Sequence, residues 1–421
     1  MRTRTTINGT LAAVLAVSLI GTWLSVAARA AVASPPSPTW TSDFPMDVSS
    51  GGVAVDRHGA TYVSGTRGEF EHSVAVLKKV DANGAVVWVR SWRPTGRAHV
   101  AGGPVALGRD GSVYLAGRVG SSHFEGGAWY LRKYRSDGTL VWAREEPGWR
   151  HGRTGDFPTG LAISRGLVLL AGSFEGCCGD FRIFDGWVRA FGVDGSHRWR
   201  APYEAPGLGA YSDEAEGVAA GAGGAIFVGG WAALGPESDM VAAPHELFLQ
   251  RLDRTGQVIW SRVYPDTAHL DQHFGTDLAV HGDALMISAL VDGHPVADRY
   301  GGRPGHAWLG RFTLNGDLVW SRSWGRTWTG AAQPIAVTTD ALGRAFVAGT
   351  VRDPSDHGLG AFVRAFAGDG RFRWQLRLEE RQRSMVGGGI AWGGHALSAI
   401  GEATGFQGRA LRGYLWRLPE A

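Results

Sequence analysis

The chain has very little cysteine and none of the short motifs that mark common enzyme families. Cys177 and Cys178 are the only two cysteines among 421 residues, and they are adjacent. A disulfide framework is therefore excluded, and the pair forms either a strained disulfide between neighbours or two thiols. A Gly-x-Ser-x-Gly elbow, a phosphate-binding loop and a His-Glu-x-x-His motif are absent from the sequence. Any catalytic site would have to be assembled from residues that lie far apart in the sequence.

Long apolar runs are absent after the N-terminus. Residues 1–33 begin with two arginines, continue with an apolar stretch over Leu11–Ala27, and contain a small-x-small site at Ala28–Arg29–Ala30. This order is typical of a secretory signal peptide, and an uncleaved membrane anchor is the alternative. We therefore expect a signal peptide over 1–33 and an exported mature chain over 34–421. That chain would have no membrane span and would be secreted, periplasmic or at the cell surface.

The chain also lacks a surplus of basic residues once the predicted signal peptide is set aside. The formal net charge is +3, from 42 Lys and Arg against 39 Asp and Glu. Arg2, Arg4 and Arg29 belong to the predicted signal peptide, which holds no acidic residue, so 39 basic and 39 acidic residues remain. Proteins that bind nucleic acid usually keep a basic surplus for the phosphates. The balance argues against a nucleic-acid partner.

Glycine and tryptophan are abundant and form a repeated phrase, first seen as DANGAVVW at Asp81–Trp88. An Asp-Gly or Asn-Gly pair favours a tight turn, and the alternation after it is typical of a strand with one buried face. Successive copies lie 54 to 61 residues apart, which predicts a repeat architecture built from β-sheets. In every copy the Gly lies four residues before the Trp: Gly84 and Trp88, Gly138 and Trp142, Gly195 and Trp199, Gly256 and Trp260, Gly316 and Trp320, and Gly370 and Trp374.

Two columns of mostly aromatic residues precede each of these glycines. Their even spacing places both columns on one face of a strand. Eight residues before the Gly stand Val76, Tyr130, Trp187, Phe248, Trp308 and Phe362. Four residues before it stand Val80, Tyr134, Phe191, Leu252, Phe312 and Phe366. Upstream come a strand that ends in a small residue and then a triplet centred on Ala: Ala54, Ala106, Ala162, Ala219, Ala279, Ala336 and Ala391.

The alanine column has seven members, one more than the Trp phrase. The seventh unit reaches Ala421 without its Trp strand, whereas Trp40 stands alone just after the predicted leader. We therefore predict an all-β fold over 34–421, a single seven-bladed β-propeller of four-stranded blades whose ring is closed by an N-terminal strand around Trp40. Closure removes exposed sheet edges. The alanines would occupy the innermost strands, where space is smallest, and the tryptophans would fill the wedges between blades.

The segments DRHGATYVSG (Asp56–Gly65) and VAVLKKVDANGAVVW (Val74–Trp88) resemble the bacterial secreted β-propeller repeat, often called SBBP. The Trp phrase also resembles the repeats of pyrroloquinoline-quinone dehydrogenases. The resemblance covers residues 40–421 and implies the propeller fold, whereas SBBP-like repeats occur in exported proteins of mostly undefined role. The calcium-binding and catalytic acid positions of the quinone enzymes have no match in this sequence. We therefore expect no cofactor, with Ca²⁺ or a quinone as alternatives.

Connections between strands divide by length. Those that link the first and second strands, or the third and fourth, are mostly short, whereas the other two sets are long and irregular, as at 173–186, 201–217 and 231–246. In a propeller both long sets emerge on one face, which we name the long-loop face. A rigid scaffold with irregular loops on one face is typical of a binding surface, and neutral drift is the alternative. Cys177 and Cys178 lie in the first of these segments.

The candidate ligand-binding residues are acidic, aromatic and histidine residues in the long connections. Carboxylates there could hold a cation or a sugar hydroxyl, or could cap loop amides. Aromatic residues could stack on sugar rings or anchor a protein, or could pack beneath the loops. The segment HLDQH, from residue 269 to 273, has metal-like spacing, but solvated loop residues fit it better. The candidates are Trp149, Asp156, Tyr211, Asp213, Glu214, Asp271, His273, Phe274, Trp324 and Trp328; Glu216 and Asp277 belong to the same acidic group.

These features favour a monomeric binding module over an enzyme. The long-loop face would engage a carbohydrate or a protein ligand. The alternative is a propeller enzyme, either a glycan-cleaving lyase or hydrolase or a quinone-dependent oxidoreductase. A catalytic residue cannot be assigned from the sequence, and the metal state is open.

Overall fold

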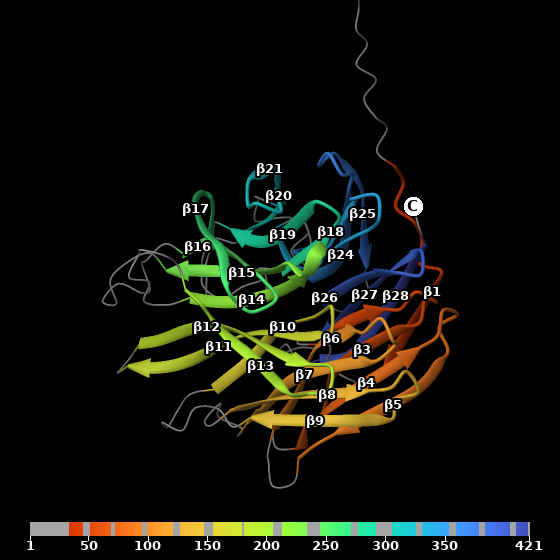
Figure 1. Cartoon of the computed structure of the whole chain (residues 1–421). Coiled ribbons are helices and arrows are strands. Elements are labelled where there is room, and N and C mark those ends of the chain that lie inside the picture. The colour runs from red at the N-terminus through yellow and green to blue at the C-terminus, as the bar shows by residue number, and fades with distance from the viewer. Residues whose placement is uncertain are drawn as a thin grey trace, which may run out of the picture. The chain divides into compact units, whose positions relative to one another are not determined.

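Seven four-stranded antiparallel blades stand in a ring as a β-propeller in the computed structural model, which confirms the predicted fold (Figure 1). A single pair, Leu270 opposite Val291, joins blades 4 and 5 into one continuous sheet. One compact unit runs from Ala33 to Ala421. The structure describes residues 33–44, 51–68, 72–94, 99–120, 127–146, 155–178, 181–204, 213–233, 245–270, 277–291, 305–325, 331–352, 359–378, 384–404 and 410–419. Only the backbone is described for residues 44, 155–156, 175–178, 181–184, 265–270, 404 and 410–411. The predicted signal peptide lies outside these ranges.

The strands of each blade run outward from the axis in chain order, except that the outer strand of blade 7 is the N-terminal one. Blade 1 contains β2 (Val53–Val55), β3 (Thr61–Arg67), β4 (Val74–Val80) and β5 (Val86–Trp92). Blade 2 contains β6 (His99–Leu107), β7 (Val113–Gly120), β8 (Ala128–Tyr134) and β9 (Leu140–Glu146). Blade 3 contains β10 (Gly155–Ser164), β11 (Leu167–Cys178), β12 (Phe181–Gly192) and β13 (His197–Tyr203). Blade 4 contains β14 (Asp213–Ala220), β15 (Ile226–Ala233), β16 (His245–Leu252) and β17 (Val258–Leu270), with the short 3-10 turn η2 (Ala222–Gly224) after β14.

The remaining blades follow the same order. Blade 5 contains β18 (Asp277–His281), β19 (Ala284–Val291), β20 (His306–Thr313) and β21 (Leu318–Trp324). Blade 6 contains β22 (Ala332–Thr339), β23 (Ala345–Arg352), β24 (Leu359–Phe366) and β25 (Phe372–Leu378). Blade 7 contains β26 (Ser384–Gly393), β27 (Ala396–Thr404) and β28 (Ala410–Pro419), and its outer strand is β1 (Trp40–Phe44). None of the described segments forms an apolar helix of membrane-spanning length.

The ring is closed by β1, as the sequence predicts. β1 pairs antiparallel with β28, from Trp40 opposite Arg417 to Phe44 opposite Gly413. The Trp40 indole N–H donates to the Ala82 carbonyl of blade 1 at 2.9 Å. The N-terminal strand therefore completes blade 7 and joins it to blade 1.

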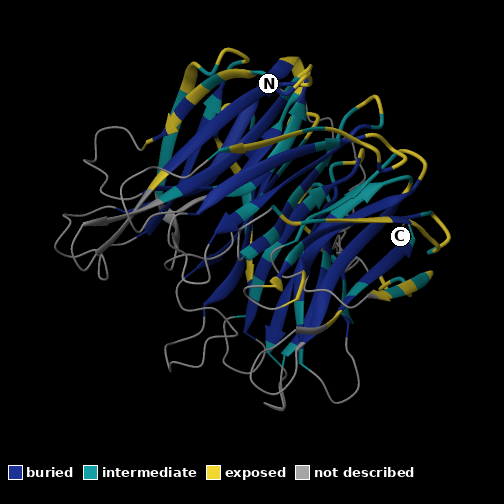
Figure 2. Cartoon of the chain, turned by 90° about the horizontal axis from the view of Figure 1, so that it is seen from below, coloured by how far each residue is buried: buried dark blue, intermediate teal, exposed yellow. Residues whose placement is uncertain are grey.

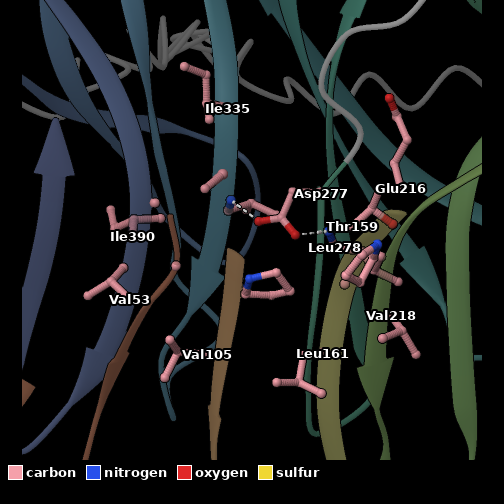
Figure 3. Close-up of a pocket in the computed structure, with 18 of the residues that line it drawn as sticks. Val53, Val105, Thr159, Leu161, Glu216, Val218, Asp277, Leu278, Ile335 and Ile390 are labelled. Atoms are coloured by element: carbon pink, nitrogen blue, oxygen red, sulfur yellow. Dashed lines mark hydrogen bonds between the residues drawn. The ribbon is translucent and has the colours of Figure 1, made fainter. Parts of the chain in front are cut away.

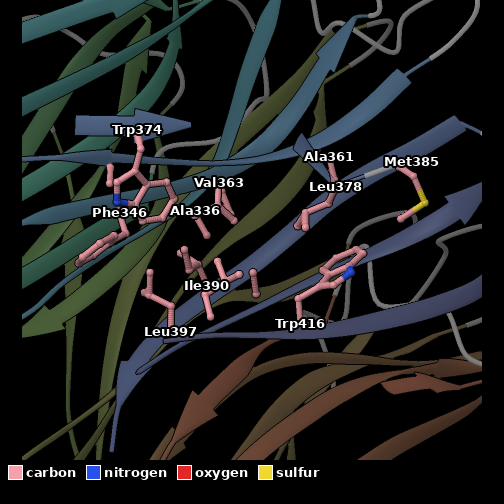
Figure 4. Packing of buried hydrophobic residues seen from close by; sticks show 14 of the residues in the cluster. Ala336, Phe346, Ala361, Val363, Trp374, Leu378, Met385, Ile390, Leu397 and Trp416 are labelled. Atoms are coloured by element: carbon pink, nitrogen blue, oxygen red, sulfur yellow. The ribbon is translucent and has the colours of Figure 1, made fainter. Parts of the chain in front are cut away.

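The described residues form seven hydrophobic core clusters, each shared by two neighbouring blades. Figure 2 shows the buried residues along the blade strands, and Figure 4 shows the cluster between blades 6 and 7, where Trp374, Phe346 and Trp416 gather. All members of both predicted third-strand columns are buried, none more than 4% exposed. Because apolar area leaves water only where blades meet, the propeller depends on its complete ring.

In four of its copies the repeated Trp phrase joins its blade to the next by a hydrogen bond. The Trp88 indole N–H donates to the Ser136 carbonyl at 3.0 Å, and Gly138 lies against the Trp88 ring. The same bond joins Trp142 to Val193, Trp199 to Arg254, and Trp320 to Gly368. The phrase therefore fills the wedges between blades, as predicted.

Candidate functional site

The inner strands surround a cavity of about 640 Å³ that every blade helps to line (Figure 3). Its lining comes mostly from the middle of the inner strands and, in blade 1, from Gly51 and Gly52 just before β2. The short turns follow the C-terminal ends of these strands, so the more N-terminal part of this lining, which includes Glu214 and Glu216, lies toward the long-loop side of the axis. A cavity of this size is typical of small-ligand sites.

β-Bulges in the inner strands shape the cavity wall. In β10, Pro158 pairs with Gly172 and Gly160 pairs with Ala171, so Thr159 has no partner in the ladder. Glu216 of β14 and Ile335 of β22 occupy the same bulged position, and β6 and β26 have equivalent register shifts. A bulge bends its strand and redirects a side chain. All three bulged residues line the cavity.

An aliphatic ring lies below the bulges, with one residue from each blade. Its members are Val53, Val105, Leu161, Val218, Leu278, Val337 and Ile390. In six blades this position precedes the predicted alanine by one residue, and several of the alanines, such as Ala219, pack into clusters between blades. The register also corrects one member of that column, because in blade 6 the equivalent residue is Thr338, opposite Phe346, not Ala336.

Asp277 is the exception in a position otherwise occupied by small residues. The residue after the bulge is Gly in blades 3 and 4, and a Cβ on Gly160 would lie 2.7 Å from the Val218 nitrogen of the next blade. In blade 5 the position holds Asp277. Its carboxylate accepts the Leu278 N–H at 2.9 Å and the Val337 N–H of blade 6 at 2.8 Å. The side chain therefore connects two inner strands at the cavity wall.

Burial raises the pKa of Asp277 to about 6, because removal from water disfavours the charged carboxylate. The hydrogen bonds from Val337 and Leu278 act in the opposite direction and lower it. The carboxylate retains some accessible surface because it faces the cavity. Asp277 thus titrates within two pH units of neutrality.

We predict that Asp277 makes folding pH-dependent between about pH 4 and pH 6. Its folded-state pKa lies above the ordinary value of 3.8, so the folded chain binds this proton more tightly than the unfolded chain does. The free energy of unfolding should therefore fall by about 2 kcal/mol as pH rises through this window, less than the full shift because the group faces a cavity. Urea unfolding at several pH values, compared with Asp277→Asn, measures the difference.

The surface control is Asp283→Asn in the same blade. Asp283 is 90% exposed and its carboxylate pairs with Arg311 at 3.3 Å, so its replacement should change stability little. A wild-type minus Asp277→Asn difference that stays constant from pH 4 to pH 7 would contradict the assignment.

Three further sequence candidates have described side chains. Asp213 and Glu214 begin β14 and are both buried, and Glu214 lines the cavity. Trp324 is the last residue of β21, not a loop residue, and it is only 9% exposed. Its ring lies 5.4 Å from that of Phe366, in the cluster between blades 5 and 6. Of the two alternatives for the aromatic candidates, Trp324 therefore follows the second and packs into the core, although in a strand and not beneath a loop.

Other candidates lie partly or wholly outside the described residues. Asp156, Cys177 and Cys178 have described backbones only: Asp156 pairs with Phe174, and the cysteines end β11, opposite β12. Segment 173–186 is thus largely a β-hairpin, not an irregular loop, and the vicinal disulfide stays a prediction. His269 belongs to β17, opposite Glu246. Among the described residues no group of His, Cys, Asp and Glu suits a metal ion. Outside the described residues lie Trp149, Tyr211, Asp271, His273, Phe274 and Trp328.

Two of the three bulged residues, Thr159 and Ile335, and the aliphatic ring were not among the sequence candidates, whereas Glu216 was. A signal was present, since small or β-breaking residues stand just before the inner aliphatic residue, as in Gly103–Pro104 and Gly388–Gly389. Glycine and proline within a strand often mark a bulge or a close backbone approach. Read in this way, the phrases Thr159–Gly160 and Glu216–Gly217 would have identified two cavity residues.

Comparisons with known proteins establish the fold alone. A scan against models of protein families found no match, and a search of curated proteins found none. Among solved structures, the polysaccharide lyase Uly1 is similar with a TM-score of 0.53 and 12% identity over 90% of each chain. A protein of unknown function from Dyadobacter fermentans has a TM-score of 0.50 and 13% identity, over 75% of this chain and 93% of the other. The Trypanosoma rangeli sialidase, in complex with the inhibitor DANA, has a TM-score of 0.51 and 9% identity, over 90% of this chain and 60% of its own length. This chain is thus similar in fold to several propellers.

Proposed function

We propose that this chain is an exported binding module that takes a carbohydrate into the long-loop end of its axial cavity. The observation that carries the proposal is the cavity itself, about 640 Å³ and lined by all seven blades. Its aliphatic ring offers a surface for the apolar face of a sugar, and the oxygens of Thr159, Glu216 and Asp277 offer partners for hydroxyl groups. An apolar enclosure with a few polar groups is typical of ligand sites.

The hydrogen bonds of Asp277 support a binding function more than a catalytic one. Both carboxylate oxygens accept backbone N–H groups, one from each of two blades, so movement of this side chain would disturb the ring. A glycan-cleaving enzyme is the second candidate, because a carboxyl group with a pKa of about 6 suits a general acid. Release of reducing sugar from the bound glycan separates the two functions.

The proposal can be tested by a substitution that places a larger side chain in the cavity. Wild-type protein is screened on a glycan array, and the best glycan is titrated by calorimetry against Ile335→Trp. Ile335 is the bulged, cavity-lining residue of β22, so the larger side chain should weaken binding by about a hundredfold, roughly 3 kcal/mol. Unchanged affinity in Ile335→Trp would overturn the cavity as the site.

Leu342→Trp is the matched control. Leu342 lies in the short turn that follows β22 in the same blade and is 71% exposed. The variant adds the same indole at the opposite end of the strand and should bind the glycan as the wild type does. A protein ligand held by the loops alone would bind both variants equally.

A further inference from the structure

The polar lining of the cavity is one-sided. Its carboxylates come from neighbouring strands of blades 4 and 5: Glu214 and Glu216 on β14, and Asp277 on β18. The opposite wall consists of glycine, proline and aliphatic residues from blades 7, 1 and 2. Within the described lining, no lysine, arginine or histidine is present. A ligand therefore meets apolar groups on one side and acidic groups on the other (Figure 3).

Asp277 lacks a cationic neighbour among the described residues. The groups that lower its pKa are two backbone N–H donors, and no basic side chain contributes. A carboxylate oxygen has two lone pairs, so each oxygen can accept a further hydrogen bond. Because the side chain faces the cavity, those positions are open to a ligand. A carboxylate removed from water is stabilised strongly by a cation that pairs with it and donates hydrogen bonds.

We propose that the cavity binds an amino sugar, a glycan with a free protonated amine that pairs with the Asp277 carboxylate. This proposal rests on the carbohydrate-binding function above and narrows it to one class of sugar. The aliphatic ring would contact the apolar face of the sugar, and the ammonium group would lie on the acidic wall. An N-acetylated sugar lacks the charge, and a uronic acid would bring a second negative charge to that wall.

The groups around Asp277 define how the site responds to pH. Glu214 and Glu216 of β14 are the other titratable groups in the described lining. The strands β19 and β22, which pack against β18, contain no titratable side chain, and His281 lies at the opposite end of β18. An ammonium group bound at Asp277 would favour the ionised carboxylate. Binding near pH 6 should therefore release a proton from the protein.

The experiment compares three tetrasaccharides by titration calorimetry at pH 6: glucosamine, N-acetylglucosamine and galacturonic acid. We expect the glucosamine tetramer to bind at least about tenfold more tightly than the N-acetylated one, and the galacturonate tetramer to bind most weakly. Titrations in two buffers of different ionisation enthalpy should show release of about half a proton per complex, since a group with a pKa near 6 is half protonated at this pH.

Asp277→Asn should remove both the amine preference and the proton release, whereas Asp283→Asn should retain them. Equal binding of the glucosamine and N-acetylglucosamine tetramers would overturn the inference and leave the carbohydrate function standing. If the protein binds no glycan at all, including those of the array, both the inference and the carbohydrate-binding function are wrong. Because proton release and the amine preference are measured on the unmodified protein, the test does not depend on how Asp277→Asn folds.

Discussion

Deletion of residues 34–44 should abolish cooperative folding of the propeller. These residues include β1, which supplies the fourth strand of blade 7 and pairs with β28 over five residues. Their loss also removes the bond from the Thr39 N–H to the Arg417 carbonyl, 2.7 Å, and uncovers Leu415 and Val80 beneath Trp40. The cost should approach the whole stability of a typical domain, roughly 5–15 kcal/mol. Thermal unfolding by circular dichroism and size-exclusion chromatography measure the outcome.

A relocated strand is the matched control for this deletion. In blade 6 the turn between β24 and β25 is Ala367–Arg371, with Phe366 opposite Phe372. The same five-residue turn, placed after Leu418 and followed by residues 38–44, would give blade 7 an ordinary hairpin. We expect this rearranged chain to fold with a melting temperature near that of the wild type. A deletion variant as stable as the wild type would show that ring closure contributes nothing.

Gly370→Ala should destabilise the protein by about 2–4 kcal/mol. Gly370 has φ +80°, a conformation that costs an L-residue roughly 1–2 kcal/mol. An added Cβ would also lie 2.7 Å from Cδ2 of Trp320, whose indole N–H donates to the Gly368 carbonyl at 3.0 Å. The ring would have to move and weaken that bond, at a further cost of about 1–3 kcal/mol. Urea unfolding measures the change.

Gly343→Ala separates the two contributions. Gly343 belongs to the same blade and has φ +70°, but an added Cβ would have no atom within 4 Å. This variant should therefore show only the backbone cost. If both variants lose the same stability, contact between the repeat glycine and the neighbouring Trp does not stabilise the joint between blades.

Much of the fold could be predicted because each blade repeats the same turns and the same pattern of buried residues. The spacing of Gly and Trp defined the outer hairpins, and the two aromatic columns identified buried residues such as Tyr130 and Trp187. The mismatch between six Trp phrases and seven inner strands located Trp40 in blade 7. These features depend on turn geometry and on one buried face per strand, which sequence patterns record directly.

The site was harder to predict from the sequence, because its residues lie where the inner strands depart from the regular repeat. A bulge shifts the register by one residue, so the side chains of Thr159 and Ile335 could not be placed from alternation alone. The alanine column was placed nearest the axis, although in six of the seven blades the cavity is lined by the residue before the alanine. In the sequence, Asp277 was one of several acidic residues near the inner strands, and nothing distinguished it from the others. Only the structure brings its carboxylate to the Val337 N–H of the next blade, 60 residues away.

A crystal structure with the glucosamine tetramer bound is the most direct test of the proposed binding site. We predict the ligand at the long-loop end of the axial cavity, with its amine within hydrogen-bond distance of an Asp277 carboxylate oxygen and a sugar ring above the aliphatic ring that includes Leu161 and Ile390. A ligand bound instead among the short turns, or along the outer strands with the cavity empty, would contradict it.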